Sequence, residues 1–137
     1  MGLILDSSII VAGERRGDTT NQLLRNISSV AGDQEVAIST VGLTEIVHAI
    51  YRAPSPSVRS RREAFIGDLL AFLDVVPYTR STAFLAGRID GEQRALGITI
   101  PSMDLLIGVT ALEIAYSVVT ANLRHFNLIP GLNVIAL

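Results

Sequence analysis

Three acidic residues stand where a folded chain could bring them into one site. Asp6 follows the apolar run Gly2–Leu5, Glu45 lies in the first turn or so of an expected helix, and Asp104 stands two residues beyond Ser102, the expected N-cap of another helix. In open α/β sheets the carboxyl ends of the strands and the first turns of the packed helices share one edge. We therefore expect these three carboxylates to meet at that edge.

The chemistry of such a site follows from its charge. Three gathered carboxylates repel one another and persist in ionised form only where cations neutralise them. The chain has no cysteine and no paired histidines, so the available ligands are oxygen atoms, which suit Mg²⁺ or Mn²⁺ rather than zinc. Such an ion generates a nucleophilic hydroxide and stabilises charge on a phosphoryl oxygen. Hydrolysis of a phosphodiester bond is the leading hypothesis.

Each acid also has an ordinary explanation when it is taken alone. An aspartate such as Asp104 in the first turn of a helix can simply complement the helix dipole, which is worth a few tenths to about 1 kcal/mol. Glu45 alone is typical of a solvated helix residue. Asp6 is harder to explain in this way, because carboxylates are almost never fully buried unless they are paired or bound. The three together favour a site.

Composition excludes several other classes of protein. The chain has 137 residues, of which 49% are apolar and 18% are charged, and this excludes a disordered chain and predicts a single domain over residues 1–137. All eleven basic residues are arginine, so lysine-dependent phosphate-binding loops, Schiff-base enzymes and receiver domains are excluded. The net charge of −2 argues against a general nucleic-acid-coating protein but leaves room for a local basic face.

The apolar runs are too short to span a membrane, and the first of them has no basic lead and contains Asp6. We therefore expect a cytoplasmic protein without a signal peptide.

Strands and helices are expected to alternate along the chain. Apolar runs predict strands ending near Leu5, Ser39, Pro77, Thr120 and Ala136, with helices between them. On the helix from about 58 to 73, Phe65, Leu69 and Phe72 are expected to point inward. Alternation of this kind predicts an α/β fold of three α/β/α layers around a central parallel sheet of about five strands.

Four segments of the chain carry a family resemblance. They are LILDSSIIVAGERRG from Leu3 to Gly17, ISTVGLTEIVHAIYR from Ile38 to Arg52, LGITIPSMDLLIGVTALEIAYSVVTANLRHF from Leu96 to Phe126, and IPGLNVI from Ile129 to Ile135. With these segments the chain resembles the PIN-domain ribonucleases, specifically the VapC-type toxins of bacterial toxin-antitoxin pairs, nearly end to end. The resemblance implies a PIN-like fold.

The resemblance also implies an activity and partners. They are those of a homodimeric, Mg²⁺- or Mn²⁺-dependent endoribonuclease that acts on RNA and is held inactive by a cognate antitoxin. It assigns Asp6, Glu45 and Asp104 catalytic roles as metal ligands. Family members often carry a fourth acid where this chain has Asn122, which the resemblance therefore makes a further catalytic candidate. Because the amide oxygen of Asn122 is neutral, the site has less negative charge than with four acids, and this argues against a second tightly held ion. Thr120 resembles a polar residue whose hydroxyl could bond a carboxylate or a substrate phosphate.

Arginines offer candidate contacts to RNA phosphates. The densest basic stretch holds Arg52, Arg59, Arg61 and Arg62, which fits either a solvated start of a helix or a phosphate-binding face; Arg15 and Arg16 are comparable. The predicted substrate contacts are Ser7, Thr120, Arg15, Arg59 and Arg62.

The two histidines are weaker candidates. His48 lies three residues beyond Glu45 and could reach the same ion, although a partly buried, hydrogen-bonded histidine explains it more simply. His125 fits a structural role or a place at the edge of the substrate.

Two other functions stay open. The chain could be a PIN-like module that binds RNA or a protein without cutting, since loss of the fourth acid would be an early step toward inactivity. It could also be an unrelated three-layer α/β phosphatase, which the absence of lysine and of a second acid close to Asp6 disfavours.

Overall fold

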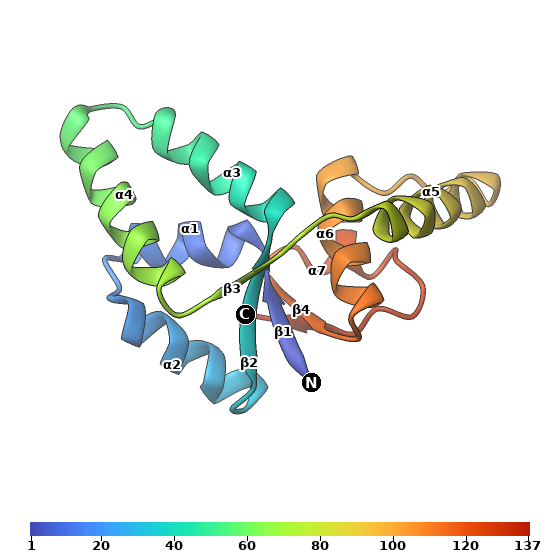
Figure 1. The fold of residues 1–137 in the computed structure, drawn as a ribbon, viewed down its shortest axis with the longest axis horizontal. Coiled ribbons are helices and arrows are strands. Elements are labelled where there is room, and N and C mark those ends of the chain that lie inside the picture. Colours follow the sequence, from blue (N-terminus) through green and yellow to red (C-terminus); the bar gives the residue numbers. More distant parts are fainter.

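The computed structural model describes all 137 residues and contains a five-stranded sheet in the order β3-β2-β1-β4-β5 (Figure 1). Every neighbouring pair of strands is parallel. The α/β fold with a central parallel sheet is therefore confirmed. The strands are β1 (Gly2–Leu5), β2 (Glu35–Ser39), β3 (Asp74–Val76), β4 (Ser117–Thr120) and β5 (Val134–Ala136).

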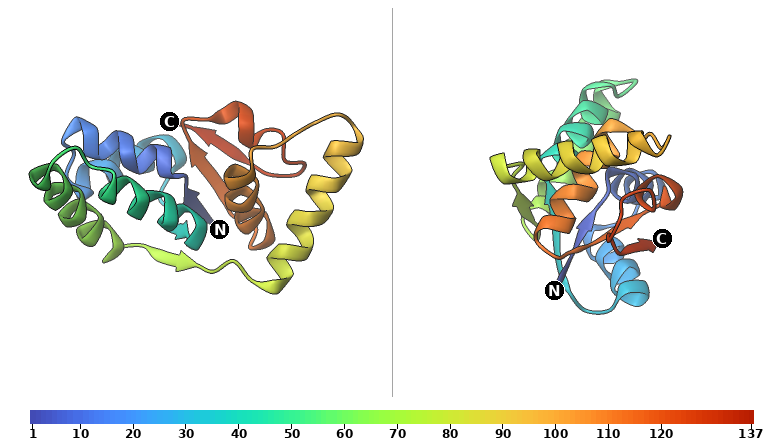
Figure 2. Two further views of the ribbon diagram at one scale, coloured as in Figure 1. Left: turned by 90° about the horizontal axis from the view of Figure 1, so that it is seen from above. Right: turned by 90° about the vertical axis from the view of Figure 1, so that its right-hand side faces the viewer.

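Seven helices connect the strands and cover both faces of the sheet. Figure 2 shows the blue and green helices α1 to α4 gathered on one side of the strands, and the yellow to red helices α5 to α7 on the other. This arrangement gives the three expected layers. The helices are α1 (Ser7–Arg16), α2 (Thr20–Ala31), α3 (Thr40–Tyr51), α4 (Pro56–Leu70), α5 (Arg80–Ala95), α6 (Ser102–Glu113) and α7 (Leu123–Phe126). None of the helices is both long and apolar enough to cross a membrane.

The central strand β1 explains why the core has two halves. All four of its residues are buried, with Leu3 and Leu5 in the cluster formed with α1 to α4, and Ile4 in the cluster formed with α5 to α7. Because successive side chains of a strand point to opposite faces, a strand covered on both sides reads as a continuous apolar run. The chain that leaves β1 therefore emerges at the edge of a sheet that is closed to solvent on both faces.

Short polar residues fix where several helices begin. Ser39 accepts a hydrogen bond from the backbone of Gly42 at the start of α3, and Thr19 forms a reciprocal capping box with Gln22 at the start of α2. Gly17 caps the C-terminal end of α1 in the left-handed region at φ 78°.

Asp6 occupies the N-cap position of α1, although its side chain makes no capping bond. Two local expectations are wrong. Pro101 takes the N-cap position of α6, so Ser102 is the first helical residue. Phe72 is 64% exposed because α4 ends at Leu70, and the helical periodicity that would have turned the ring inward stops there.

The topology brings the starts of three helices to one edge. β1 leads directly into α1, and β2 leads directly into α3. Helix α6 comes before β4 in the chain, so its first residue lies at the edge of the sheet where β4 ends. The strands β2, β1 and β4 are neighbours in the sheet. The edge at their carboxyl ends is where the candidate residues are found.

Candidate active site

Asp6 is the buried centre of the candidate site. It follows β1 directly and is only 2% exposed. Its backbone N–H donates to the carbonyl of Val119 at 3.0 Å. Its Oδ2 accepts two hydrogen bonds, from the Ser8 hydroxyl at 2.6 Å and from the Thr120 hydroxyl at 2.8 Å. The end of β4 and the first turn of α1 therefore hold one oxygen of this carboxylate in place.

The same hydroxyls anchor the loop after β4. The Ser8 oxygen accepts from the backbone N–H of Ala121 at 3.2 Å, and the Thr120 oxygen accepts from that of Asn122 at 2.8 Å. Asn122 thus follows the site as expected, although its side chain is exposed and makes no hydrogen bond. Ser8 was not among the expected site residues. The sequence feature that could have indicated it is a hydroxyl-bearing residue two positions after an acid that follows a strand.

Glu45 lies on α3 beside the same edge. Its Oε1 accepts a hydrogen bond from the Ser7 hydroxyl at 2.9 Å. Partial burial raises the pKa of Glu45 above its ordinary value of 4.5, the Ser7 hydrogen bond opposes this shift, and the charges of Asp6 and Asp104 raise the pKa further. The three acids are therefore close enough for their charges to act on one another.

Asp104 lies in the first turn of α6, where His125 of α7 meets it. The Nδ1 atom of His125 is 2.8 Å from Oδ2 of Asp104. Burial raises the pKa of Asp104 above its ordinary 3.8, while the hydrogen bond to His125 opposes the shift and the charge of Asp6 adds to it. The residues around Asp104 therefore fix its orientation, and the sequence did not indicate this pairing.

The donor atoms suit a hard cation, but they do not form a closed ligand set. No group of three or more His, Cys, Asp or Glu side chains is placed so that it could hold a metal ion as it stands. Oδ1 of Asp6 accepts no hydrogen bond from the protein, so this atom is free to bind an ion. Mg²⁺ usually keeps several waters and binds through one or two carboxylates. The oxygen donors therefore fit such an ion if water completes its shell.

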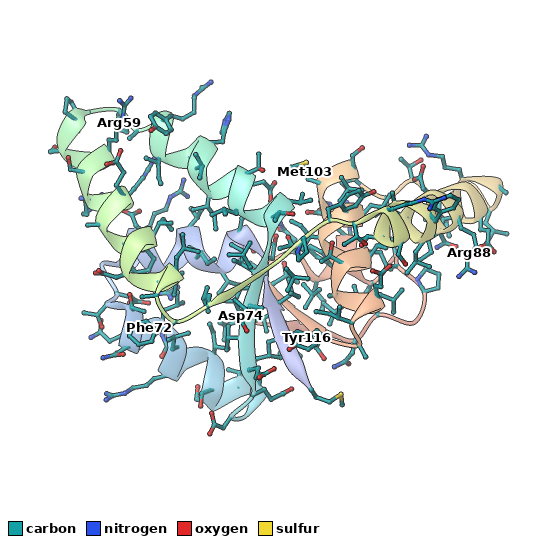
Figure 3. The ribbon with its side chains drawn as sticks, in the orientation of Figure 1. Arg59, Phe72, Asp74, Arg88, Met103 and Tyr116 are labelled. Atoms are coloured by element: carbon teal, nitrogen blue, oxygen red, sulfur yellow. The ribbon has the colours of Figure 1, made fainter.

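The expected basic residues divide into two groups. Arg62 donates to the carbonyl of Ala49 at 2.7 Å and lies 3.8 Å from Glu14, whose side chain is 7% exposed; Arg61 donates to Glu14 at 3.0 Å. These two arginines tie α4 to α1 and α3. Arg59 is exposed above the ring of Tyr51, 5.1 Å from its centroid, and Figure 3 shows it near the beginning of α4.

Arg15 is exposed at the rim of an apolar groove between α1, α3 and α4, where Glu14 and Arg62 also line the wall. None of these arginines forms a hydrogen bond or an ion pair with the three acids.

These features define a class of protein, a three-layer α/β protein with carboxylates at the carboxyl edge of a parallel sheet. The PIN domain family matches residues 3–131, and the chain belongs to this family. The resemblance noted in the sequence is confirmed. The curated relative "Ribonuclease VapC1" of Rickettsia felis is 33% identical over 135 residues, which cover 98% of this chain and 96% of the relative.

Solved structures share the fold along the whole chain. VapBC2 from Rickettsia felis, bound to a DNA fragment from its promoter, has a TM-score of 0.86 at 22% identity, covering 100% of this chain and 99% of that one. VapBC-5 from Mycobacterium tuberculosis, a member of the VapBC family of toxin-antitoxin systems, has a TM-score of 0.74 at 20% identity, covering 100% and 98%. At these identities the two structures show the fold.

Proposed function

We propose that this protein is the endoribonuclease toxin of a toxin-antitoxin pair, and that it hydrolyses RNA phosphodiester bonds with the help of Mg²⁺ or Mn²⁺. The observation that carries the proposal is the buried Asp6, whose charge acts on both Glu45 and Asp104 at one edge of the sheet. A relative of nearly the same length that is named a ribonuclease supports the same activity. A cytoplasmic location and a homodimer stay predictions.

The three carboxylates are the proposed ligands. When bound, a divalent ion supplies positive charge to a phosphoryl oxygen and eases deprotonation of a water molecule. Asp6 offers its open Oδ1 while Ser8 and Thr120 hold its other oxygen. Ser7 orients Glu45, and His125 orients Asp104. Asn122 offers a neutral amide beside the site. These contacts keep the acids in position before substrate arrives.

The reaction requires that water attack phosphorus and that one phosphorus–oxygen ester bond break. The leaving oxygen takes up a proton, and the attacking water gives one up. Glu45 and Asp104, as proposed ligands, would be ionised once an ion is bound, and Ser7 and His125 hold them in place for this step. RNA phosphates away from the site would meet the exposed Arg15 and Arg59.

The activity is tested with the purified chain, free of antitoxin, incubated with total RNA and Mg²⁺ or Mn²⁺. We expect cleavage that EDTA abolishes and that Asp6→Asn lowers by a factor of about 10² or more, since this substitution removes the central charge while keeping the shape. Glu63→Asn, on the exposed face of α4, is the matched control and should cleave like the parent chain. Cleavage that survives in Asp6→Asn would contradict the proposal.

A binding module without activity is the second candidate, and the open ligand set favours it. Isothermal titration of Mn²⁺ into the protein separates the two. Absence of both cleavage and Mn²⁺ binding would favour the module, whereas Mn²⁺ binding that Asp6→Asn abolishes supports the nuclease.

The antitoxin is proposed to occupy the apolar groove between α1, α3 and α4. Six of the nine residues that line the groove are hydrophobic, and Ile10, Ile46 and Ile66 are among them. An amphipathic helix lays its apolar face into grooves of this kind. Arg15 at the rim would attract an acidic side chain of the partner.

A further inference from the structure

A second hollow opens beside Glu45, next to the candidate site. Five residues line it, and two of them, Ser7 and Glu45, belong to the site already described. The other three, Thr44, His48 and Met103, have no part in the proposed chemistry. The hollow is thus continuous with the site but has walls of a different kind.

Two helices supply these walls. Thr44 and His48 lie one turn apart on α3 and share a face of that helix. Met103 comes from α6, immediately before Asp104. Figure 3 shows Met103 near the beginning of α6, in the space between α6 and α3. An imidazole ring and a thioether therefore meet across one opening next to the carboxylates.

All three side chains are exposed to solvent. His48 is exposed and its ring makes no hydrogen bond, contrary to the expected partly buried, hydrogen-bonded histidine. Met103 is 37% exposed. The Thr44 hydroxyl donates to the carbonyl of Thr40 at 3.1 Å, which leaves its oxygen free to accept a hydrogen bond.

The chemistry of these walls fits an unpaired nucleobase. Proteins recognise unstacked RNA bases by stacking them on aromatic side chains, histidine included, and by hydrogen bonds to their edges. A thioether adapts its shape to apolar and aromatic surfaces. A base of the nucleotide next to the scissile phosphate must lie close to the acids, and this hollow, which shares Ser7 and Glu45 with the site, is an opening within that reach.

We infer that the hollow between α3 and α6 binds one unpaired nucleobase adjacent to the scissile phosphate, packed between His48 and Met103 with its edge toward the Thr44 hydroxyl. The inference rests on the proposed function, because it requires an RNA phosphate at the acids. It makes His48 and Met103 specificity-determining residues that contact substrate without taking part in bond breaking.

The test measures binding in the Asp6→Asn background, so that no turnover is needed. Short single-stranded RNAs carrying a fluorophore are compared by anisotropy with the same RNAs made abasic at one position at a time. We expect one abasic position to weaken binding about five- to hundredfold, the range for loss of one stacked base. His48→Ala and Met103→Ala should weaken binding of the intact RNA and leave binding of that abasic RNA unchanged.

Two further variants separate stacking from other roles of His48. His48→Phe keeps an aromatic face but cannot ligate a metal or move a proton, so it should restore binding and the preference for the intact RNA. Val47→Ala, at an exposed neighbour outside the hollow, is the matched control. In the cleaving chain, His48→Ala should raise KM with kcat nearly unchanged. Mn²⁺ affinity, measured by calorimetry, should be the same in His48→Ala and the parent.

Several results would overturn the inference. One is an equal loss by His48→Ala on the intact and on every abasic RNA. Others are failure of His48→Phe to restore binding, or a fall in Mn²⁺ affinity in His48→Ala, which would make His48 a ligand. Failure of the proposed function has a different signature: the parent chain would cleave no RNA, while the anisotropy comparison would still report on the hollow.

Discussion

At the scale of residues, Asp6 accepts its hydrogen bonds from two neutral hydroxyls, those of Ser8 and Thr120. Neutral donors satisfy the lone pairs of a buried carboxylate without cancelling its charge, as an arginine in their place would. The charge therefore remains to attract a cation and to raise the pKa of Glu45 and Asp104. We expect this uncancelled negative charge to lower the free energy of unfolding at neutral pH.

The raised pKa values predict how stability depends on pH. A carboxyl group with a raised pKa in the folded state binds its proton more tightly there than in the unfolded state, so its protonation stabilises the fold at low pH. This stabilisation is lost as the pH rises from the ordinary pKa values, 3.8 for Asp104 and 4.5 for Glu45, through the raised ones. Glu45→Gln removes one charge and can keep the Ser7 hydrogen bond. We expect its Tm, measured by calorimetry, to exceed that of the parent at pH 7, with the difference vanishing near pH 4.

Two comparisons check this prediction. Mg²⁺ or Mn²⁺ should raise the Tm of the parent at pH 7 more than that of Glu45→Gln, since binding to the folded state stabilises it. Glu63→Gln, an exposed glutamate with no recorded ion pair, should change neither quantity. A lower Tm for Glu45→Gln at pH 7 would mean that hydrogen bonding outweighs charge repulsion there.

At the scale of elements, α6 packs closely against the segment that follows α7. A Cβ atom on Gly108 would meet the side chain of Ile129 and lie 3.1 Å from Leu132 Cδ2. Ile129 is 2% exposed, so it cannot move out into solvent. This close contact fixes the position of α6 against the segment that follows α7, and with it the meeting of Asp104 and His125.

A pair of glycine substitutions tests that packing. Gly108→Ala should lower the free energy of unfolding, because overpacking costs about 1–3 kcal/mol and exceeds the roughly 1 kcal/mol that alanine adds to helix propensity. Gly67→Ala, on α4 where a Cβ would meet nothing within 4 Å, should raise it by about 0.5–1 kcal/mol. Urea unfolding measures both, and a stabilised Gly108→Ala would show that Ile129 relaxes freely.

Much of this arrangement could be predicted from the sequence, because apolar periodicity and caps mark the elements, and strand ends mark the edge where acids meet. The pairing of Asp104 with His125 could not, since it depends on the angle at which α7 returns to α6. The role of Ser102 was predicted wrongly because Pro101 occupies the N-cap position of α6. The burial of Phe72 was predicted wrongly because α4 ends at Leu70. The exposure of His48 also could not be predicted, since helical periodicity alone does not show whether a side chain lies at the surface or in the core.

At the scale of the whole molecule, the candidate site and the apolar groove lie on either side of α3. Glu45 is on its first half, and Ile46, Ala49 and Ile50 turn toward the groove. A partner in the groove therefore packs against the helix that carries a proposed ligand. Binding there can influence the site without filling it.

The groove is tested by one charged substitution. Val11→Asp places a carboxylate among apolar residues of the groove, so we expect it to abolish co-purification with the cognate antitoxin while RNA cleavage is retained. Val30→Asp, at an exposed position on α2 outside the groove, should leave the complex intact. Co-purification of Val11→Asp at the parent level would place the antitoxin elsewhere.

The bond between Thr120 and Asp6 joins residues 114 positions apart. During synthesis at about 5–20 residues per second, Asp6 is made roughly 6–23 seconds before the hydroxyl that holds it. A nascent chain on the ribosome therefore carries its acids without the partner that positions them, and it gains a working site only when β4 has emerged and folded beside β1. We therefore expect the order of synthesis itself to delay completion of the site until nearly the whole chain has been made.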